Sequence, residues 1–309
     1  FSNTVPPPIV GAAKRAFQIL DETTHLRDKL EGNTQFFRTE IQKEGFEITY
    51  LPVDDTGSFR GSDVVKALRK DTILISLMYV NNEIGTIQPI ADIAKVVRQK
   101  KKSQNIYFHT DANQAPLYLS LNTVKLGVDM MTLGGQKIYG PKGVGCLYKK
   151  KDVEIILPRA GTENIPLIVG FAKALEFAEK NKEEEVKRLT GLRDYFIEEL
   201  NKNIPQAELN GSRELRSPNN VNIYIPNIDG EFFVVLLDNK GIACSTKSAC
   251  KSVDGDKGSY MIQALGYSKE RAKSSLRFSL GKDTTKSDID YTARVLKESI
   301  EKYSKNANI

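Results

Sequence analysis

The stretch TILISLMYV (residues 72–80) is apolar over almost its whole length and leads directly into polar residues. Apolar runs of this length are typical of strands that are buried on both faces of a parallel sheet. NIYFHTDA (105–112) and DMMTLGG (129–135) have the same character. Because helical patterns lie between these runs, the sequence predicts an α/β fold with a parallel-rich sheet covered by helices.

The helical patterns are SDVVKALRK (62–70), with Ser62 as the expected N-cap, and PIADIAKVVRQKKK (89–102). Upstream of both, FEITYLPV (46–53) alternates between apolar and polar residues and predicts another strand. A long helical stretch from about residue 165 to 201 then leads into a second pattern.

The second pattern begins past Pro205 and is typical of an α+β unit. Its last helix is expected from about residue 286 to 302, with Ser287 as the N-cap. The sequence therefore predicts a smaller C-terminal domain after the large one. Its other segments are NNVNIYIP (219–226), DGEFFVVLLDNKG (229–241), SYMIQALG (259–266) and SSLRFSLG (274–281).

The composition narrows the classes of function. No apolar run approaches the roughly 18 residues of a membrane helix, so we expect a soluble protein with no membrane contact. The net charge of +6 raises the question of nucleic acid, but the basic runs at 98–102 and 148–152 are not interleaved with aromatic residues. We therefore expect no direct nucleic-acid contact.

Three cysteines cannot all pair, and a free thiol indicates a reducing compartment, so the prediction is a cytoplasmic protein. Cys146 lies in an apolar strand and is expected in the core. Cys244 is either a core residue or an auxiliary thiol. The polar flanks of Cys250 argue against a small buried side chain. No metal site is expected.

Polar sequences follow each of the three apolar strands: VNNEIG (80–85), HTDANQAP (109–116) and GGQK (134–137). In open parallel sheets, ligands bind beyond the carboxyl ends of the strands. An amide, a carboxylate and an amine are thus expected to converge on one crevice.

Each of these residues also has a purely structural explanation. Asn82 would then cap the next helix, Asp111 would fix a turn, and Lys137 would be a surface lysine. Together, however, they suit pyridoxal 5′-phosphate (PLP) chemistry, in which a lysine forms a Schiff base and a carboxylate pairs with the pyridine nitrogen. The glycines before Lys137 would let the backbone approach a flat cofactor.

The landmarks of this chain, taken in order, resemble those of the cysteine desulfurases, which are PLP enzymes of the class V aminotransferase group with PLP-dependent transferase fold type I. The resemblance covers roughly residues 44 to 300. The sequences that carry it are VNNEIGTIQPI, HTDANQAP, GGQKIYGPKGVGCLY, AGTENIPLIVGFAKALE, NNVNIYIPNIDGE, CSTKSAC and SSLRFSLG.

The resemblance implies a role for each matching residue. Lys137 would hold PLP and move protons at the substrate carbon. Asp111 would contact the pyridine nitrogen, and Gln114 the ring hydroxyl. Asn82, which also borders the cofactor, and Arg277 would bind the substrate carboxylate, the arginine through its bidentate fork.

Further roles concern the phosphate and the thiol. Thr162 would reach the cofactor phosphate of a partner subunit, which implies a homodimer. Cys250 would be the nucleophile that takes the sulfur of L-cysteine as a persulfide and releases L-alanine. A cation, Lys247 or Lys251, would favour its thiolate.

The chain departs from the family pattern at several points. Gln136 stands where a histidine is usual and is assigned to cofactor binding, and Gly134 stands where a phosphate-binding serine is common. A Gly-Ala-Thr-Glu phosphate loop and a ring-stacking histidine are missing, since His25 and His109 lie in other contexts. The glycine-rich loop that the family normally has before GTEN is also missing.

Residues 1–45 resemble instead a stretch of the α-oxoamine synthases, such as glycine C-acetyltransferase. We therefore predict a helical N-terminal segment of atypical origin over 1–45. A partial PLP-binding large domain would follow over 46–180, and a small domain with the catalytic cysteine loop over 181–309.

The expected function is removal of sulfur from L-cysteine and its delivery to an acceptor protein, of either the iron–sulfur scaffold or the tRNA-thiolation type. Two alternatives stay open at this point. One is a catalytically impaired remnant of the PLP fold. The other is an acyltransferase like glycine C-acetyltransferase.

Overall fold

The computed structural model describes residues 39–101, 105–155, 162–247 and 258–307. The chain divides into two compact units, Phe1–Tyr50 with Ala249–Gly255, and Leu51–Ser248 with Asp256–Ile309. Of the first unit, only residues 39–50 are described, and residues 39–43 are helical. All elements below belong to the second unit.

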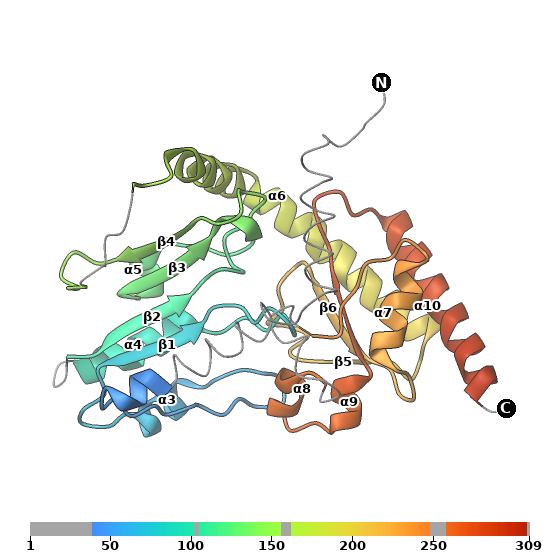
Figure 1. Cartoon of the computed structure of the whole chain (residues 1–309), viewed down its shortest axis with the longest axis horizontal. Helices are drawn as coiled ribbons and strands as arrows, with labels where there is room; N and C mark the ends of the chain where they lie inside the picture. The colour runs from blue at the N-terminus through green and yellow to red at the C-terminus, as the bar shows by residue number, and fades with distance from the viewer. Residues whose placement is uncertain (1–38, 102–104, 156–161, 248–257, 308–309) are drawn as a thin grey trace. The chain divides into compact units, whose positions relative to one another are not determined.

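The first sheet has four strands in the order β1 (Leu74–Met78), β2 (Tyr107–Asp111), β3 (Met130–Gly134) and β4 (Gly145–Lys149). β1, β2 and β3 are parallel, and β4 is antiparallel to β3. The arrows of the three parallel strands point the same way in Figure 1. The prediction of a parallel-rich sheet is therefore confirmed.

One face of this sheet forms a core with three helices, α3 (Gly61–Ala67), α4 (Ile90–Lys101) and α5 (Thr123–Leu126). Apolar side chains of alternate strand positions pack there, because successive strand residues point to opposite faces. The strand side chains in this core include Ile75, Leu77, Phe108 and Met131.

The opposite face is less apolar than the sequence predicted. Leu74 is 50% exposed, and Ser76 is exposed as well. Since β1 pairs in register with β2, Ser76 lies opposite His109, and Met78 lies opposite Asp111. The side chains of His109 and Asp111 thus share this second face.

Three local predictions were wrong. Residues 46–53 form no strand, because alternation creates a suitable pattern but a strand also requires a paired backbone. The N-cap of α3 is Arg60 and not Ser62, so that helix begins without a side-chain cap. The last helix, α10 (Lys286–Ala307), is capped by Thr285, whose hydroxyl accepts a hydrogen bond from the Asp288 backbone N–H, and not by Ser287.

The second sheet is antiparallel, with the order β5 (Glu208–Leu209), β6 (Asn220–Tyr224) and β7 (Ser275–Ser279). It packs into a core with α6 (Ile165–Asn203), α7 (Gly230–Asp238) and α10. Two short helices, α8 (Tyr260–Ala264) and α9 (Lys269–Lys273), precede β7. The predicted α+β pattern is present.

Helix α6 is continuous through residue 180, where the sequence predicted a domain boundary. Its first half packs near the loop after β3, since a Cβ added at Gly135 would lie 3.3 Å from the Phe171 ring. Its second half joins the core of the second sheet. Figure 1 shows this helix extending from the first sheet to the second.

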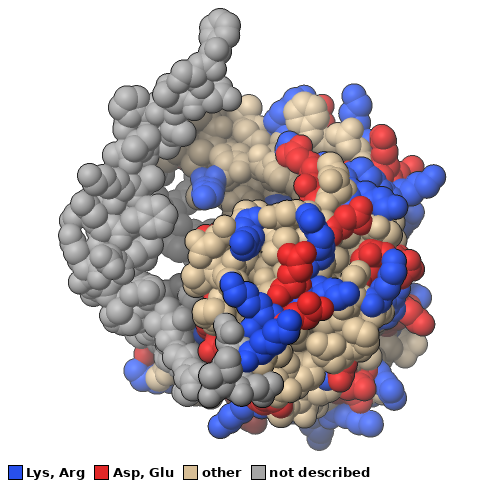
Figure 2. Space-filling view, turned by 90° about the vertical axis from the view of Figure 1, so that its right-hand side faces the viewer, with Lys and Arg blue, Asp and Glu red and all other residues tan. Residues whose placement is uncertain are grey.

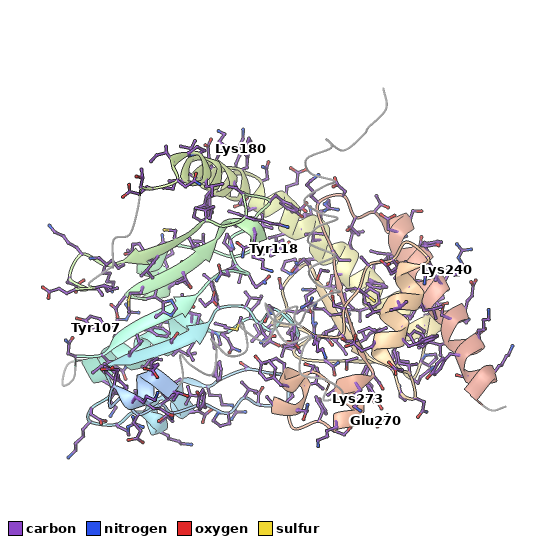
Figure 3. The ribbon with its side chains drawn as sticks, in the orientation of Figure 1. Tyr107, Tyr118, Lys180, Lys240, Glu270 and Lys273 are labelled. Carbon is purple, nitrogen blue, oxygen red and sulfur yellow. The ribbon has the colours of Figure 1, made fainter. Side chains whose placement is uncertain are left out.

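The direction of the strands identifies the edge of the sheet at which a site is expected. Figure 3 labels Tyr107 at the beginning of β2 and Tyr118 beyond its carboxyl end. Tyr118 is buried in the core of the second sheet. The carboxyl ends of β1, β2 and β3 therefore face the part of this unit that carries β6 and β7.

The described surface carries charges of both signs. Figure 2 shows basic and acidic side chains interspersed on the face it presents. No helix among the described residues has the length and apolar character needed to cross a membrane.

A glycine after β1 tests how tightly the two sheets pack. Gly85 has φ +74°, and a Cβ there would lie 2.6 Å from the Asn220 side chain. We expect Gly85→Ala to lower the free energy of unfolding in urea by roughly 2–4 kcal/mol, through backbone strain and overpacking. Gly266→Ala is the matched control, because its φ is +90° and nothing lies near the added Cβ. Equal losses in both variants would show that packing at Gly85 contributes nothing.

Candidate active site

The turn after β1, residues 81–85, is organised by Asn81. Its Oδ1 accepts hydrogen bonds from the backbone N–H groups of Glu83 (2.9 Å) and Ile84 (3.0 Å), and its carbonyl accepts one from Gly85 N (3.1 Å). Asn82 lies within this turn and its side chain makes no hydrogen bond with another described residue. Asn81 therefore stabilises this turn, and Asn82 does not cap the next helix.

Arg277 lies on β7 and meets this turn. Its Nη1 donates to the Asn82 carbonyl at 3.0 Å. Among the described residues its Nε is buried and has no hydrogen-bond partner. Burial lowers the pKa of Arg277, and the nearby Glu83 opposes that shift. A buried donor without an acceptor is a candidate for binding an anionic ligand.

Asp111 ends β2 and fixes the turn that follows. One carboxylate oxygen accepts hydrogen bonds from Asn113 N (2.9 Å) and Asn113 Nδ2 (2.7 Å). The structural explanation for Asp111 is thus correct for that oxygen, whereas the other oxygen makes no hydrogen bond with a described residue. On the same face, Ser76 Oγ lies 2.8 Å from His109 Nδ1. Burial lowers the pKa of His109, which Asp111 opposes.

Lys137 closes a 3-10 turn, η1 (Gly135–Lys137), directly after β3. It is exposed and makes no ion pair or hydrogen bond with a described residue. The glycines before it serve the packing of their own loop. A Cβ at Gly134 would lie 2.6 Å from Asn113 Oδ1, and one at Gly135 would lie 2.7 Å from the Pro141 carbonyl oxygen.

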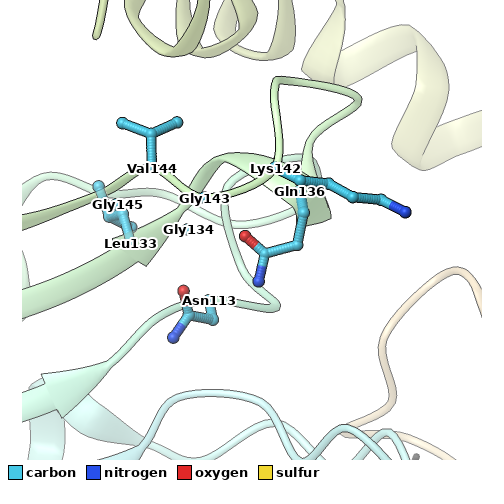
Figure 4. Close-up of a pocket in the computed structure, with 8 residues that line it drawn as sticks. All are labelled: Asn113, Leu133, Gly134, Gln136, Lys142, Gly143, Val144 and Gly145. Carbon is cyan, nitrogen blue, oxygen red and sulfur yellow. The ribbon is translucent and has the colours of Figure 1, made fainter. Parts of the chain in front are cut away.

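A pocket of about 530 Å³ lies at the end of β3 and the loop to β4, beside Asn113 of the turn after β2 (Figure 4). Figure 4 shows the Gln136 amide directed toward Asn113, whereas the Lys142 side chain extends away from both. Lys137 and Asp111 are not among its lining residues. The lining residues are Asn113, Leu133, Gly134, Gln136, Lys142, Gly143, Val144 and Gly145.

Other predicted site residues lie apart from this pocket. Gln114 is half-buried in the turn after β2. Thr162 is exposed ahead of α6, whose N-cap is Asn164. The predicted nucleophile Cys250, the candidate cation Lys251 and His25 lie outside the described residues. The segment leading toward Cys250 does border Arg277, because Ser245 and Arg277 exchange backbone hydrogen bonds.

Two cysteine predictions can be assessed. Cys146 was expected in the core but is exposed, because β4 lies at the edge of the described sheet. Cys244 packs against the core of the second sheet, and burial, together with Asp238, raises its pKa to about 12. Its side chain is therefore that of a core residue. Lys247 is 8% exposed and pairs with Glu231 at 3.5 Å.

Sequence reasoning missed the residues that hold the turn 81–85 in place. Asn220 and Asn222 each donate a side-chain hydrogen bond to the Glu83 carbonyl at 3.0 Å. A signal was present, because asparagine is unusual at buried strand positions and NNVN (219–222) places two of them on β6. Their partner is set by tertiary contact and could not be read from the sequence.

Comparisons with known proteins complete this description. A model of the family "Aminotransferase class-V" matches residues 26–159 and 156–292. The chain belongs to this family. Cysteine desulfurase IscS of Dictyoglomus turgidum is 46% identical over 272 residues, which are 85% of this chain and 68% of the relative. The protein of the same name from Methanosarcina thermophila is 44% identical, over 85% of this chain and 66% of its own length.

The chain is also similar in structure to solved proteins. A NifS-like protein has a TM-score of 0.76 at 32% identity and covers 85% of this chain and 71% of its own. SspA in complex with cysteine has a TM-score of 0.62 at 29% identity and covers 80% of this chain and 69% of its own. The predicted PLP-transferase fold type I is confirmed, and the chain groups with the cysteine desulfurases of the class-V family.

The chain spans about two thirds of the length of these curated relatives. The family match begins at residue 26, inside the segment 1–45 that resembles the α-oxoamine synthases. Most of that segment lies outside the described residues, so its separate origin stays a prediction.

The described residues can be tested against PLP, the cofactor of this family. Lys137 offers an amine with no other described partner, Asp111 keeps one free carboxylate oxygen, and Arg277 has a buried donor without an acceptor. For the phosphate, the pocket offers the Gln136 amide. This donor set fits the cofactor, with the phosphate bound by groups other than a serine at position 134.

The burial of Cys244 leads to a prediction about thiol reactivity. At pH 8, iodoacetamide is expected to alkylate Cys146 on the order of 100-fold faster than Cys244, because only the thiolate reacts. Mass spectrometry of the two peptides measures both rates, and unfolding in urea should make them similar. Because the pKa of Cys244 is higher in the folded protein than in the unfolded chain, the free energy of unfolding is expected to fall as the pH rises from the ordinary thiol pKa toward 12. Equal rates in the folded protein would contradict the assignment.

Proposed function

We propose that this protein is a PLP-dependent cysteine desulfurase, which converts L-cysteine to L-alanine and retains the sulfur as an enzyme persulfide. One observation in the structure supports the proposal independently of family membership. Arg277 is half-buried beside Asn82, and its buried Nε has no acceptor among the described residues, as a site for a substrate carboxylate requires. The relatives named cysteine desulfurase support the same reaction.

The residues at the carboxyl ends of the strands would hold the cofactor. Lys137 would bind it covalently, and the free oxygen of Asp111 would accept a hydrogen bond from the pyridine nitrogen. Gln114 would bind the ring hydroxyl, while Gln136 would contribute to the phosphate site. When bound, PLP supplies an electron sink for the substrate carbon. Lys137 would then move a proton at that carbon.

Arg277 and Asn82 would orient the substrate. The guanidinium can offer two parallel N–H groups to the carboxylate, and the existing bond from its Nη1 to the Asn82 carbonyl fixes its plane. Because Arg277 is largely buried, the ion pair with the substrate would form in a low dielectric, where it is stronger than at the surface.

Cys250 would carry the sulfur. Its thiolate attacks the substrate sulfur, a new S–S bond forms as the C–S bond breaks, and the electron pair with a proton remains on the substrate carbon, which yields L-alanine. Lys247 is already paired with Glu231, which leaves Lys251 as the candidate cation beside this thiol. The persulfide would pass to an acceptor protein of the iron–sulfur scaffold or tRNA-thiolation type.

The test uses absorbance and sulfide release. After incubation with PLP, the chain is expected to show the absorbance band of lysine-bound cofactor near the visible edge, and Lys137→Ala should abolish it. Lys142→Ala is the matched control and should retain the band. Cys250→Ser should retain the band and lose sulfide release from L-cysteine. A chain that stays colourless with PLP would favour the impaired remnant, and sulfide release that survives Cys250→Ser would remove the assigned nucleophile.

The proposed enzyme works as a homodimer in which Thr162 of one copy reaches the cofactor phosphate of the other. An apolar stripe directly after Thr162 supports this arrangement, because large exposed apolar side chains gather where proteins associate. On the first half of α6 the exposed members are Ile165, Ile168, Val169 and Phe177.

Sedimentation equilibrium tests the dimer. Val169→Glu is expected to weaken association at least tenfold, because a charge would be buried in the interface. Val235→Glu on α7 is the matched control, since both valines are 61% exposed. Association that is unaffected in Val169→Glu, or equally weakened in both variants, would exclude this face of α6 as the interface.

The cellular compartment is proposed on chemical grounds. Cys146 and Cys244 are free thiols in the described structure. Free thiols persist in reducing compartments, which supports a cytoplasmic location.

A further inference from the structure

The Glu83 carbonyl is the atom through which the second sheet binds the turn 81–85 by hydrogen bonds. Glu83 is 1% exposed. Its carbonyl oxygen accepts hydrogen bonds from Asn220 Nδ2 and Asn222 Nδ2, each at 3.0 Å. Its carboxylate accepts a further hydrogen bond from Ser259 Oγ at 2.6 Å. Two donors on one strand therefore meet at a single oxygen of the turn that contains Asn82.

The orientation of the Asn220 amide is fixed by Arg216, on the side away from Glu83. Arg216 Nη1 donates to Asn220 Oδ1 at 2.9 Å. Burial, together with Arg193 and Arg213, lowers the pKa of Arg216 to about 9, so it remains a cation near neutral pH. A guanidinium can only donate, so the amide oxygen must face Arg216, and the amide NH₂ must face Glu83.

The Asn222 amide is fixed by a longer chain of the same kind. Arg271 Nε donates to Asn210 Oδ1 at 2.8 Å, and Asn210 Nδ2 then donates to Asn222 Oδ1 at 2.9 Å. Asn222 Nδ2 is left facing the Glu83 carbonyl. The direction of every hydrogen bond in both chains follows from an arginine that cannot accept.

The immediate neighbour of this fixed carbonyl is the group that binds Arg277. The peptide between Asn82 and Glu83 presents its C=O to Arg277 Nη1 at 3.0 Å and its N–H to Asn81 Oδ1 at 2.9 Å. The Glu83 carbonyl belongs to the next peptide, which shares the Glu83 Cα with this one, so a displacement of that carbonyl that also moves the shared Cα shifts the acceptor in front of Arg277.

We propose that Asn220 and Asn222 are positioning residues which, through the Glu83 carbonyl, hold the Asn82 peptide where it orients the Arg277 guanidinium. The assignment rests on the proposed function only in that Arg277 receives the substrate carboxylate. The positioning itself is a property of the chain without ligand. It explains why a five-residue turn is fixed by two buried amides and two buried arginines, since a turn with no role in recognition needs no such network.

The first measurement needs neither cofactor nor activity. The full chain is treated with phenylglyoxal, and modification of Arg277 is followed by mass spectrometry of its peptide. Asn222→Asp keeps the shape of the side chain but loses the donor toward Glu83, and Asn222→Ser does so without burying a charge. In both variants we expect Arg277 to react about fivefold faster, as loss of one hydrogen bond implies.

Two controls separate positioning from general loosening. Asn219→Asp alters an adjacent asparagine whose Oδ1 accepts from Ser217 and which does not touch Glu83, so it should leave the Arg277 rate unchanged. Arg193 is buried and reports unfolding, so its rate should stay constant in every variant. An Arg277 rate that is unchanged in both Asn222 variants, or that rises in step with Arg193, would overturn the proposal.

A second measurement links the network to substrate. In the chain reconstituted with PLP, Asn222→Ser is expected to raise KM for L-cysteine about fivefold with a smaller change in kcat, because substrate orientation is weakened while the reacting groups remain. Equal losses of PLP affinity and KM would contradict a role specific to Arg277. If the unaltered chain takes up no PLP, the proposed function fails, and the phenylglyoxal rates still decide the positioning.

Discussion

The structure around the site depends on one property of the guanidinium group, which is that it donates hydrogen bonds and never accepts them. Arg216 and Arg271 are both buried, and each imposes a direction on the asparagine amides in front of it. The two chains of hydrogen bonds end on the same carbonyl in the turn after β1. A segment that belongs to the first sheet in sequence is thereby held by the second. Gly85 completes this contact, because only a residue without a side chain can approach Asn220 so closely.

This constraint leaves Arg277 more firmly held than Lys137. On β7, Arg277 is half-buried and its Nη1 donates to the Asn82 carbonyl. On the side of β3, Lys137 is exposed at the end of a short turn, and the adjoining pocket is lined by glycines and two facing amides. In the proposed enzyme, an amine with no other described partner is what Lys137 needs if it is both to hold a cofactor and to move protons.

The sequence predicted the elements whose apolar pattern is long and regular. β1, β2, β3, α4, α6, β6 and β7 lie where periodicity placed them, because burial enforces that pattern on the residues. Helix caps at Ser62 and Ser287 were wrong, since a cap depends on a local geometry that several nearby residues can supply. Motifs at strand ends singled out Asn82, Asp111 and Lys137 as candidates. They did not reveal Asn220 and Asn222, because the sequence does not show whether a buried asparagine contacts a turn or a helix.

Burial of Cys244 has a consequence for how sulfur would travel through this protein. The outer sulfur of a persulfide can be transferred to any neighbouring thiolate. Cys244 stands only six positions before Cys250 in the chain, yet its proton is retained across the physiological range. In the proposed enzyme, this second thiol, although close in sequence, would be unreactive and would not take the sulfur from Cys250, so the sulfur would pass to a separate acceptor.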